Sequence, residues 1–254
     1  MKSKLLTNFI FFFILIFFIQ GCTVNHTAIK SVAQTNSATQ IDEFKIEILK
    51  ELLNYKKKLD LRNPNAFNKD LVSSINHQIT SNRDFINIVQ NGKKLETYKE
   101  YLYYAFSDEL IDNRNDLLIL GIYKHIYKAF NMQEQHQFSA MQYNQEEMIR
   151  LYEYLQVVRW KIKTAKDKKG DYLFNTWQNN WQIELAKRYD GDYNVINDLL
   201  YIKTNKESVY DHSNFSFEIV LSKILTNVEH SLRKINVEPY EMGISALKSF
   251  IFII

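Results

Sequence analysis

The sequence predicts an all-α protein, a single irregular bundle of about eight or nine helices, with solenoid-like packing of helical hairpins left open. Only two prolines and six glycines occur in 254 residues, and these residue types are the strongest breakers of regular structure. Apolar residues recur at spacings of three and four through much of the chain, which is the period of one helix face. These two observations favour long helices over strands.

The chain opens with a segment typical of an export signal. Lys2 and Lys4 form a short basic start, and an unbroken apolar stretch, residues 9–19, follows. As a helix rising about 1.5 Å per residue, this stretch would cover about half of a hydrocarbon core about 30 Å thick. Residues 1–21 are therefore predicted to be a removable signal peptide, in preference to a retained membrane anchor.

The end of this segment resembles the lipobox of bacterial lipoproteins. It reads Ile19-Gln20-Gly21-Cys22, with an aliphatic residue, a small residue and then the required cysteine; Gln20 departs from the small residue common at its place. The resemblance covers only the first 22 residues. It implies cleavage before Cys22 and a diacylglycerol on the Cys22 sulfur. Because Thr23 follows and not Asp, it also implies the outer membrane in a host with two membranes.

The use of cysteine agrees with this interpretation. Cys22 is the only cysteine of the chain, and a single thiol cannot form an internal disulfide in an exported protein. A free or buried thiol is the alternative. Each buried methylene contributes about 0.8 kcal/mol, so two or more acyl chains hold a protein stably on a membrane. We expect the membrane to be a partner through lipid on Cys22.

The charge of the mature chain argues against nucleic acid as a partner. The full sequence has 32 basic and 29 acidic residues, and removing residues 1–21 takes away Lys2 and Lys4 and no acid. The remaining formal charge, near +1, is too small to indicate a binding surface for nucleic acid. An envelope protein is the partner that we expect instead.

Two regions are predicted after the signal peptide. Residues 22–40 are expected to be a lipidated flexible tether, because they are small and polar and contain no aromatic residue. As a random coil, this stretch would separate membrane and domain by roughly 20 to 25 Å. Residues 41–254 are the predicted helical domain.

The first two helices are expected to form a hairpin. The first ends at Asn63-Pro64, and Asn65 is the expected N-cap of a second helix that ends before Gly92. Their apolar stripes are Phe44, Ile48, Leu52, Tyr55 and Leu59, and then Phe67, Leu71, Ile75, Ile79, Ile86 and Val89.

Two further helices are predicted over residues 95–106 and from residue 110 or 116 to residue 130. Gly121, inside the second of them, predicts close packing against a neighbouring helix. His125 is expected to be a hydrogen-bonded histidine of the core. A Gln-rich stretch without helical periodicity follows and is predicted to be the longest loop.

The second half of the chain carries the clearest helix signals. Asn144 and Glu147 form a capping pair for a fifth helix, which is expected to close at Gly170. Asp171 is the expected cap of a sixth helix, and a shorter helix follows Asp192. The stripes are Leu151, Leu155, Val158, Ile162 and Ala165; Phe174, Trp177, Trp181 and Leu185; Ile196 and Leu200; and Phe217, Leu221, Ile224, Val228, Leu232 and Ile235.

A last helix is expected from Pro239, which suits the first turn of a helix. It carries an apolar stripe into the C-terminal residues 250–254. This tail is too short to span a bilayer. Burial in the core is favoured, and a segment that seeks a partner or a membrane is the alternative.

Standard catalytic and cofactor motifs do not occur in the sequence. It contains no G-x-S-x-G, Walker, G-x-G-x-x-G or H-E-x-x-H motif, and its six histidines lack ligand spacing. A single cysteine also excludes thiol-disulfide chemistry within the chain. We therefore expect no cofactor and no metal. Whether the chain is an enzyme is left open, with a non-enzymatic protein favoured.

Two clusters of acidic residues are candidate cation sites. The first, Asp190, Asp192 and Asn194, matches the start of an EF-hand loop, but Val195 and Tyr201 replace its glycine and bidentate glutamate, which favours a capping turn. The second cluster comprises Asp108, Glu109, Asp112, Arg114 and Asp116. There we favour a solvated, self-neutralised helix start over a site for a cation or an arginine-bearing partner.

The most distinctive stretch of the domain combines indoles with amides. Trp177 and Trp181 lie one helical turn apart, and Gln178 and Gln182 follow them. Indoles and amides together can stack on and hydrogen-bond a sugar ring, which predicts a glycan or small-ligand site at these four residues. The favoured alternative is that both indoles belong to the core, since they continue the stripe of their predicted helix.

A remote alternative is a cell-wall enzyme. Glu207-Ser208 resembles the Glu-Ser start of the lytic transglycosylase motif, and many enzymes of that family are helical lipoproteins. The Gly-Leu-Met-Gln segment of the family does not follow here. The hypothesis that these features favour is instead a membrane-anchored envelope lipoprotein that acts as a protein-interaction or assembly module.

Lipid attachment is testable directly. We expect the Cys22→Ser variant to incorporate no radiolabelled fatty acid in cells, because the thioether needs the Cys22 sulfur, whereas the unaltered chain is labelled. Equal labelling of the two proteins would contradict the lipobox interpretation.

Overall fold

The computed structural model of the chain describes residues 26–133, 143–176, 189–190, 192 and 216–239, and this part is mostly helical. The predicted signal peptide and Cys22 lie outside it. The helices are α2 (His26–Arg62), α3 (Val72–Thr80), α4 (Tyr98–Ala105), α5 (Arg114–Ala129), α6 (Gln145–Thr164) and α10 (Ser216–Lys234), with the 3-10 turn η1 (Lys69–Leu71) before α3. The strands are β1 (Val89–Gln90) and β2 (Lys93–Lys94), which pair antiparallel.

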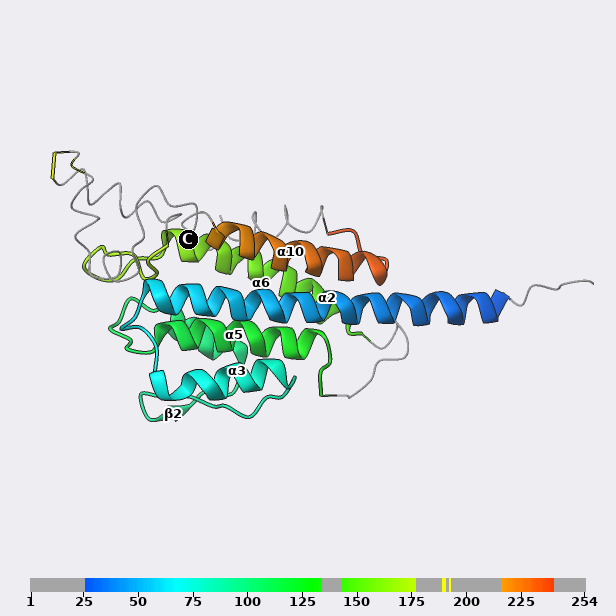
Figure 1. Ribbon diagram of the computed structural model, residues 1–254, viewed down its shortest axis with the longest axis horizontal. Coiled ribbons are helices and arrows are strands. Elements are labelled where there is room, and N and C mark those ends of the chain that lie inside the picture. Colours follow the sequence, from blue (N-terminus) through cyan, green and yellow to red (C-terminus); the bar gives the residue numbers. More distant parts are fainter. Residues whose placement is uncertain (1–25, 134–142, 177–188, 191, 193–215, 240–254) are drawn as a thin grey trace, which may run out of the picture.

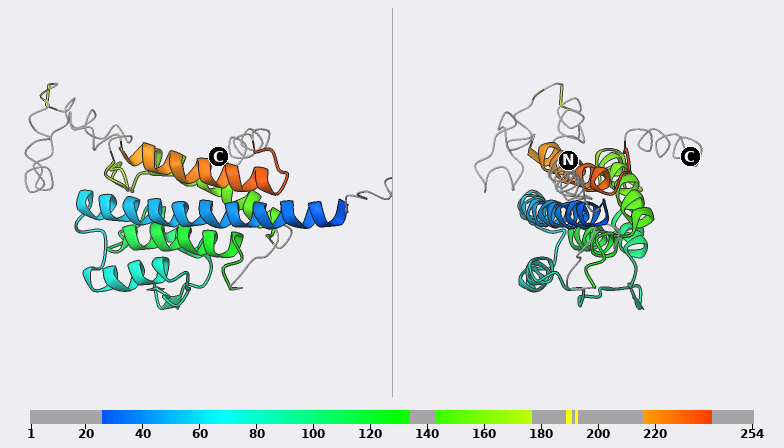
Figure 2. Two further views of the ribbon diagram at one scale, coloured as in Figure 1. Left: turned by 45° about the vertical axis from the view of Figure 1, so that its right-hand side comes forward. Right: turned by 90° about the vertical axis from the view of Figure 1, so that its right-hand side faces the viewer.

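Four helices form the body of the described part. α2, α5, α6 and α10 make a ring in which each helix packs against the next, with α10 closing the ring on α2. Figure 1 shows α10 and α5 on opposite sides of α2, and the end view in Figure 2 shows the four helices around a common centre. α4 packs against α5, and α3 packs against α2. Among the described helices, none has the length and apolar character needed to cross a membrane.

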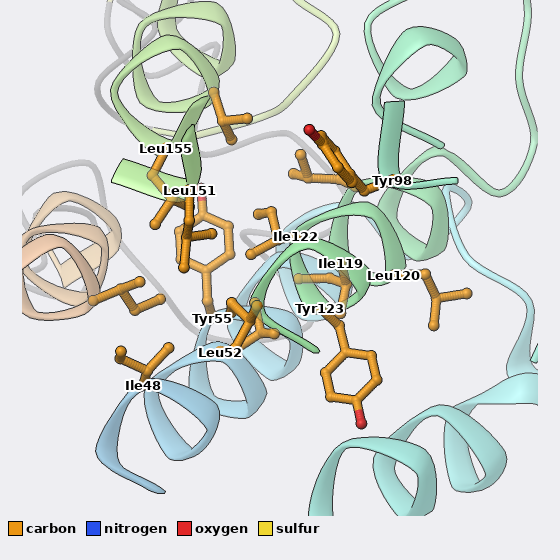
Figure 3. Packing of buried hydrophobic residues seen from close by; sticks show 14 of the residues in the cluster. Ile48, Leu52, Tyr55, Tyr98, Ile119, Leu120, Ile122, Tyr123, Leu151 and Leu155 are labelled. Atoms are coloured by element: carbon orange, nitrogen blue, oxygen red, sulfur yellow. The ribbon is translucent and has the colours of Figure 1, made fainter. Parts of the chain in front are cut away.

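The core fills the centre of this ring. Figure 3 shows the buried side chains of α2, α5 and α6 meeting there, with Tyr98 of α4 at the edge. The predicted stripes of the first, fifth and late helices are confirmed, because nearly all of their apolar residues are buried. The buried members are Ile48, Leu52, Tyr55, Leu59, Leu151, Leu155, Val158, Ile162, Phe217, Leu221, Ile224, Val228 and Leu232.

The first helix begins earlier than predicted. Residues 26–40, expected as part of a flexible tether, form the first turns of α2, and Ala38 is buried with 2% exposure. Elongating a helix adds one hydrogen bond for each residue fixed, whereas nucleation is unfavourable. A weakly polar stretch joined to a packed helix can therefore continue it. α2 spans 37 residues.

The second helix is shorter than predicted. α3 ends at Thr80, and the Thr80 and Ser81 hydroxyls both donate to the carbonyl of His77. Asn82 then takes a left-handed conformation with φ 55°. The buried Gln78 side chain accepts hydrogen bonds from the backbone N–H groups of residues 85 and 86, at 2.9 and 2.6 Å. These contacts satisfy backbone groups that a longer helix would otherwise bond internally.

The end of the predicted second helix is a β-hairpin. Asn91 and Gly92 both have positive φ, 51° and 75°, and connect β1 to β2. An Asn-Gly pair is the strongest short-range signal for such a turn, and the apolar stripe through Ile86 and Val89 concealed it. The Tyr101 hydroxyl accepts a hydrogen bond from the Ile88 N–H at 2.8 Å, which ties the hairpin segment to α4.

The predicted C-terminal end of the fifth helix and the predicted start of the sixth are wrong. α6 starts as predicted, with the Asn144 side chain accepting from the Glu147 N–H at 3.1 Å, but it ends at Thr164 and not near Gly170. The Asp167 carboxylate then accepts the N–H groups of residues 169 and 171, and an isolated bridge joins residues 166 and 172. Residues 171–176 are not helical. The remainder of the sixth helix, the helix after Asp192 and the apolar C-terminal tail lie outside the described residues.

The close packing predicted at Gly121 is confirmed. A Cβ atom at this position would lie 2.9 Å from Cγ and Cδ2 of Leu102 and 3.1 Å from Cβ of Tyr101. α4 therefore approaches α5 closely because residue 121 has no side chain.

We expect Gly121→Ala to lower the free energy of unfolding. Overpacking costs about 1–3 kcal/mol, which exceeds the gain of about 1 kcal/mol from replacing Gly by Ala in a helix. In the Leu102→Ala background the same substitution should cost less or be neutral, because the two closest atoms, Cγ and Cδ2 of Leu102, are gone. Urea denaturation of the four proteins of this cycle measures the coupling. A stabilising Gly121→Ala in the unaltered background would contradict the close approach.

Candidate functional site

The site residues predicted from the sequence lie outside the described residues. This applies to Cys22, to Glu207 and to the ligand-binding candidates Trp177, Gln178, Trp181 and Gln182. Among the residues that the structure describes, a groove lies between α2 and α3.

The α2–α3 groove has a volume of about 720 Å³, within the range of about 300–1,000 Å³ that ligand pockets occupy. Its apolar lining comprises Leu53, Leu61, Pro64, Phe67 and Val72, and its polar lining Asn54, Lys56, Lys57, Asp60, Asn76 and Thr80. Leu61 is 49% exposed. The groove thus combines apolar walls with charged and amide groups.

The groove exists because of the sequence between the two helices. Asn63 ends α2 with its N–H donating to the Leu59 carbonyl at 2.8 Å, and Pro64 cannot continue the helical hydrogen bonding. Asn68 then caps η1, its side chain accepting from the Asp70 N–H at 2.9 Å. The chain therefore reverses within a few residues and sets α3 beside α2.

Lys56 is the unusual member of the lining. It is only 2% exposed, and its Nζ forms ion pairs with Asp60 on the same helix and with Asp116 on α5, the latter at 3.5 Å. The ammonium also lies 5.4 Å from the centre of the Phe67 ring, within reach of a cation–π attraction. One buried cation thus joins α2 to α5 and to a wall of the groove.

The two carboxylates differ in how their oxygens are bound. Asp60 accepts a hydrogen bond from Asn115 Nδ2 at 3.0 Å. Asp116 is fully buried, and its Oδ2 accepts the Asn68 N–H at 2.7 Å. Within the described part of the chain, its Oδ1 has only the long contact with Lys56. One positive charge therefore faces two negative charges in a nearly dry environment.

The pKa values reflect this environment. Burial raises the pKa of Asp116 to about 6, against the opposing effects of the Asn68 N–H and the Lys56 ammonium. Burial also raises the pKa of Asp60, and Lys56 again opposes the shift. Desolvation thus outweighs attraction at both carboxyls, which is the usual balance for a buried ion pair.

The structure corrects the prediction of a solvated, self-neutralised start for α5. Arg114 is 7% exposed and donates not to carboxylates but to three backbone carbonyls, those of Ala105 and Ser107 at 2.8 Å and of Glu109 at 2.6 Å. Asp116 is buried as well, and only the remaining three acids are exposed. Across the described residues, no group of three or more His, Cys, Asp or Glu side chains could hold a metal ion.

His125 is a core residue, as predicted, with 1% exposure. Its ring stacks on Tyr98 with 3.8 Å between ring centroids and 4° between planes. The expected hydrogen bond is not made by Nε2, which has no partner among the described residues. Burial lowers the pKa of His125 to about 3, so a neutral ring packs here as an aromatic group.

The charged part of the groove was missed by sequence reasoning. In the sequence, Lys56 belongs to a run of three lysines, residues 56–58, and Asp60 lies four residues later, the spacing of neighbours on one helix face. That spacing was the available signal. Burial of the pair depends on Asn115 and Asp116 of α5 and on Phe67, which the spacing does not reveal.

No protein-family model matches the chain, and no curated protein or solved structure is significantly similar to it. A proposal about function therefore rests on the residues and their geometry.

We expect Lys56→Met to destabilise the protein by about 3–5 kcal/mol at pH 7, because removing one partner leaves buried carboxylates without their cation. The loss should shrink between pH 7 and pH 5. In the folded variant Asp116 takes up a proton in this range, since its pKa is already raised and no longer opposed by Lys56, whereas the unfolded carboxyl, with a pKa of about 3.9, remains ionised.

Lys57→Met is the matched control, since Lys57 is exposed in the same groove and should change stability by less than about 0.5 kcal/mol. Denaturant unfolding across this pH range measures both variants. Equal stabilities for Lys56→Met and Lys57→Met at pH 7 would contradict the buried ion cluster.

Proposed function

We propose that the chain is a lipid-anchored lipoprotein of the bacterial envelope, in the outer membrane where the host has two membranes, and that its helical body binds a protein partner. The anchor is supported by the sequence Ile19-Gln20-Gly21-Cys22. The interaction is supported by the α2–α3 groove, and this groove is the observation that carries the proposal.

The composition of the groove suits a segment of another protein. Apolar side chains of α2 and α3 form its walls, and Leu61 is half exposed at its rim. An amphipathic helix that lays its apolar face into a hydrophobic groove is a recurring mode of recognition. The Asn54 and Asn76 amides on the two walls can hydrogen-bond polar groups of such a segment and set its register. The proposed occupant is an amphipathic helix of an envelope protein.

The length of α2 bears on the distance between the proposed lipid anchor and the groove. Its 37 residues extend about 55 Å at 1.5 Å per residue. The groove-lining residues begin at Leu53, about 40 Å along the helix from His26. With a lipid at Cys22, the helix would therefore allow the groove to lie up to about 40 Å from the bilayer, on a helical spacer where a coil was expected.

The finer details of the predicted fold and site stay proposals. A total of eight or nine helices also requires those predicted within residues 177–188 and 193–215 and after residue 239, which lie outside the described residues. The same holds for a glycan site at Trp177, Gln178, Trp181 and Gln182, and for a muralytic role of Glu207. The described groove supports the protein-interaction function ahead of these alternatives.

Site-specific crosslinking in cells tests the proposal. A photoreactive amino acid at Leu61 or at Asn76 places a crosslinker on either wall of the groove. Ile219 on α10 is the matched control, because it is 54% exposed against 49% for Leu61 and lies outside the groove. We expect a defined protein adduct from both groove positions, none from Ile219, and loss of the adduct in Cys22→Ser.

The arms of this experiment separate the two parts of the proposal. Adducts of equal yield from Ile219, or none from either groove position, would contradict the interaction at the groove. Adducts that persist in Cys22→Ser at full yield would leave the groove in place and contradict its dependence on the anchor.

A further inference from the structure

A second concave surface lies next to the groove, on a different set of segments. This hollow has a volume of about 480 Å³ and is lined by Asn65, Phe67, Asn68, Gln90, Asp112 and Asn113, with Leu110 also contributing. Phe67 lines both the hollow and the α2–α3 groove. We call the second surface the amide hollow and propose that it binds a saccharide.

Most polar side chains that line the amide hollow form no hydrogen bond with other described residues. Asn113 is the N-cap of α5, yet it makes no side-chain capping hydrogen bond, although Asn is among the preferred capping residues. In the part of the chain that the structure describes, the side chains of Asn65, Gln90 and Asp112 likewise form no hydrogen bond or ion pair. Four side chains therefore have free hydrogen-bonding capacity at one surface.

The kind of ligand follows from the types of these groups. A carboxamide offers two donors and an acceptor, and a carboxylate offers acceptors only. Sugar hydroxyls both donate and accept, so they match a mixture of Asn, Gln and Asp. No lysine or arginine lines the hollow, and Asp112 is its one charged residue. This composition disfavours phosphate, which needs cations, and divalent metals, which need several carboxylate or carbonyl oxygens.

The apolar members of the amide hollow suit the other face of a sugar. Phe67 is half-buried, and an aromatic ring packs against the C–H face of a pyranose. Leu110 is 95% exposed, so binding would remove its side chain from water, a gain of about 25 cal/mol for each Å² buried. The amides and the carboxylate of the hollow can bind the hydroxyl groups of a sugar, and its apolar side chains can pack against the sugar ring.

The hollow is held in shape before any ligand arrives. The segment before η1 and the start of α5 are joined by the Asn115 N–H donating to the Ala66 carbonyl at 2.8 Å. The Asn68 N–H donates to Asp116 at 2.7 Å, and Asn115 Nδ2 donates to the Asn63 carbonyl at 3.4 Å. Preorganised backbone lowers the entropy lost on binding.

Calorimetric titration of the full mature chain tests this inference. The protein is kept in a detergent without a sugar headgroup, and the probes are the N-acetylglucosamine tetramer, cellotetraose and maltotetraose. We expect one tetrasaccharide to bind with one-to-one stoichiometry. Asn113→Ala and Asp112→Ala should each weaken its binding about fivefold, the effect of one lost hydrogen bond.

Asn36→Ala is the matched control, an exposed Asn on α2 outside the hollow, and it should bind as the unaltered chain does. Asp112 is exposed and makes no contact that folding requires, so its variant keeps the test valid if Asn113→Ala unfolds. The inference is overturned if no tetrasaccharide binds, or if binding is the same in Asp112→Ala and Asn36→Ala. Binding of an uncharged peptide in place of every sugar would overturn it too.

Discussion

Lys56 Nζ lies between the carboxylates of Asp60 and Asp116, and through this contact α2 is joined to the first turn of α5. Asp116 also accepts the Asn68 N–H, so the same carboxylate sets where η1 begins and thereby how α3 lies beside α2. Both concave surfaces are bounded by segments that meet here. The groove has Lys56 and Asp60 in its lining, and the amide hollow is built on the residues that flank Asn68 and Asp116.

Stability alone does not require these charges. Replacing a buried ion pair by apolar residues of similar volume is often neutral or stabilising, because desolvation offsets the attraction. The rest of the ring has an apolar core that supplies the main driving force for folding. A charged cluster beside a groove is instead suited to holding three segments in one arrangement, so that the surfaces between them keep a constant shape. Loops positioned by a rigid scaffold are the usual carriers of binding residues.

Local signals in the sequence predicted local features well. The capping pair of Asn144 and Glu147, the stripe of α10 and the close approach at Gly121 all depend on neighbours along the chain or on the absence of a side chain. The ends of helices were predicted less well. The Gln78 and Asp167 side chains accept backbone N–H groups of residues that follow α3 and α6, which a longer helix would bond internally. Apolar residues beyond such ends keep a helical spacing by chance, which is why the Asn91-Gly92 turn was passed over.

The sequence by itself determined the helical class, most of the buried stripes and the absence of known catalytic motifs. These features depend on composition, on the spacing of apolar residues and on local sequence. It did not determine the environment of charged residues. Lys56 and Arg114 look like surface cations in the sequence, and the tertiary structure buries both. Asp116 of α5 and the Phe67 ring lie against Lys56, and the end of α4 and the segment after it lie against Arg114. Only tertiary packing decided this, since the burial of a side chain depends on what lies over it.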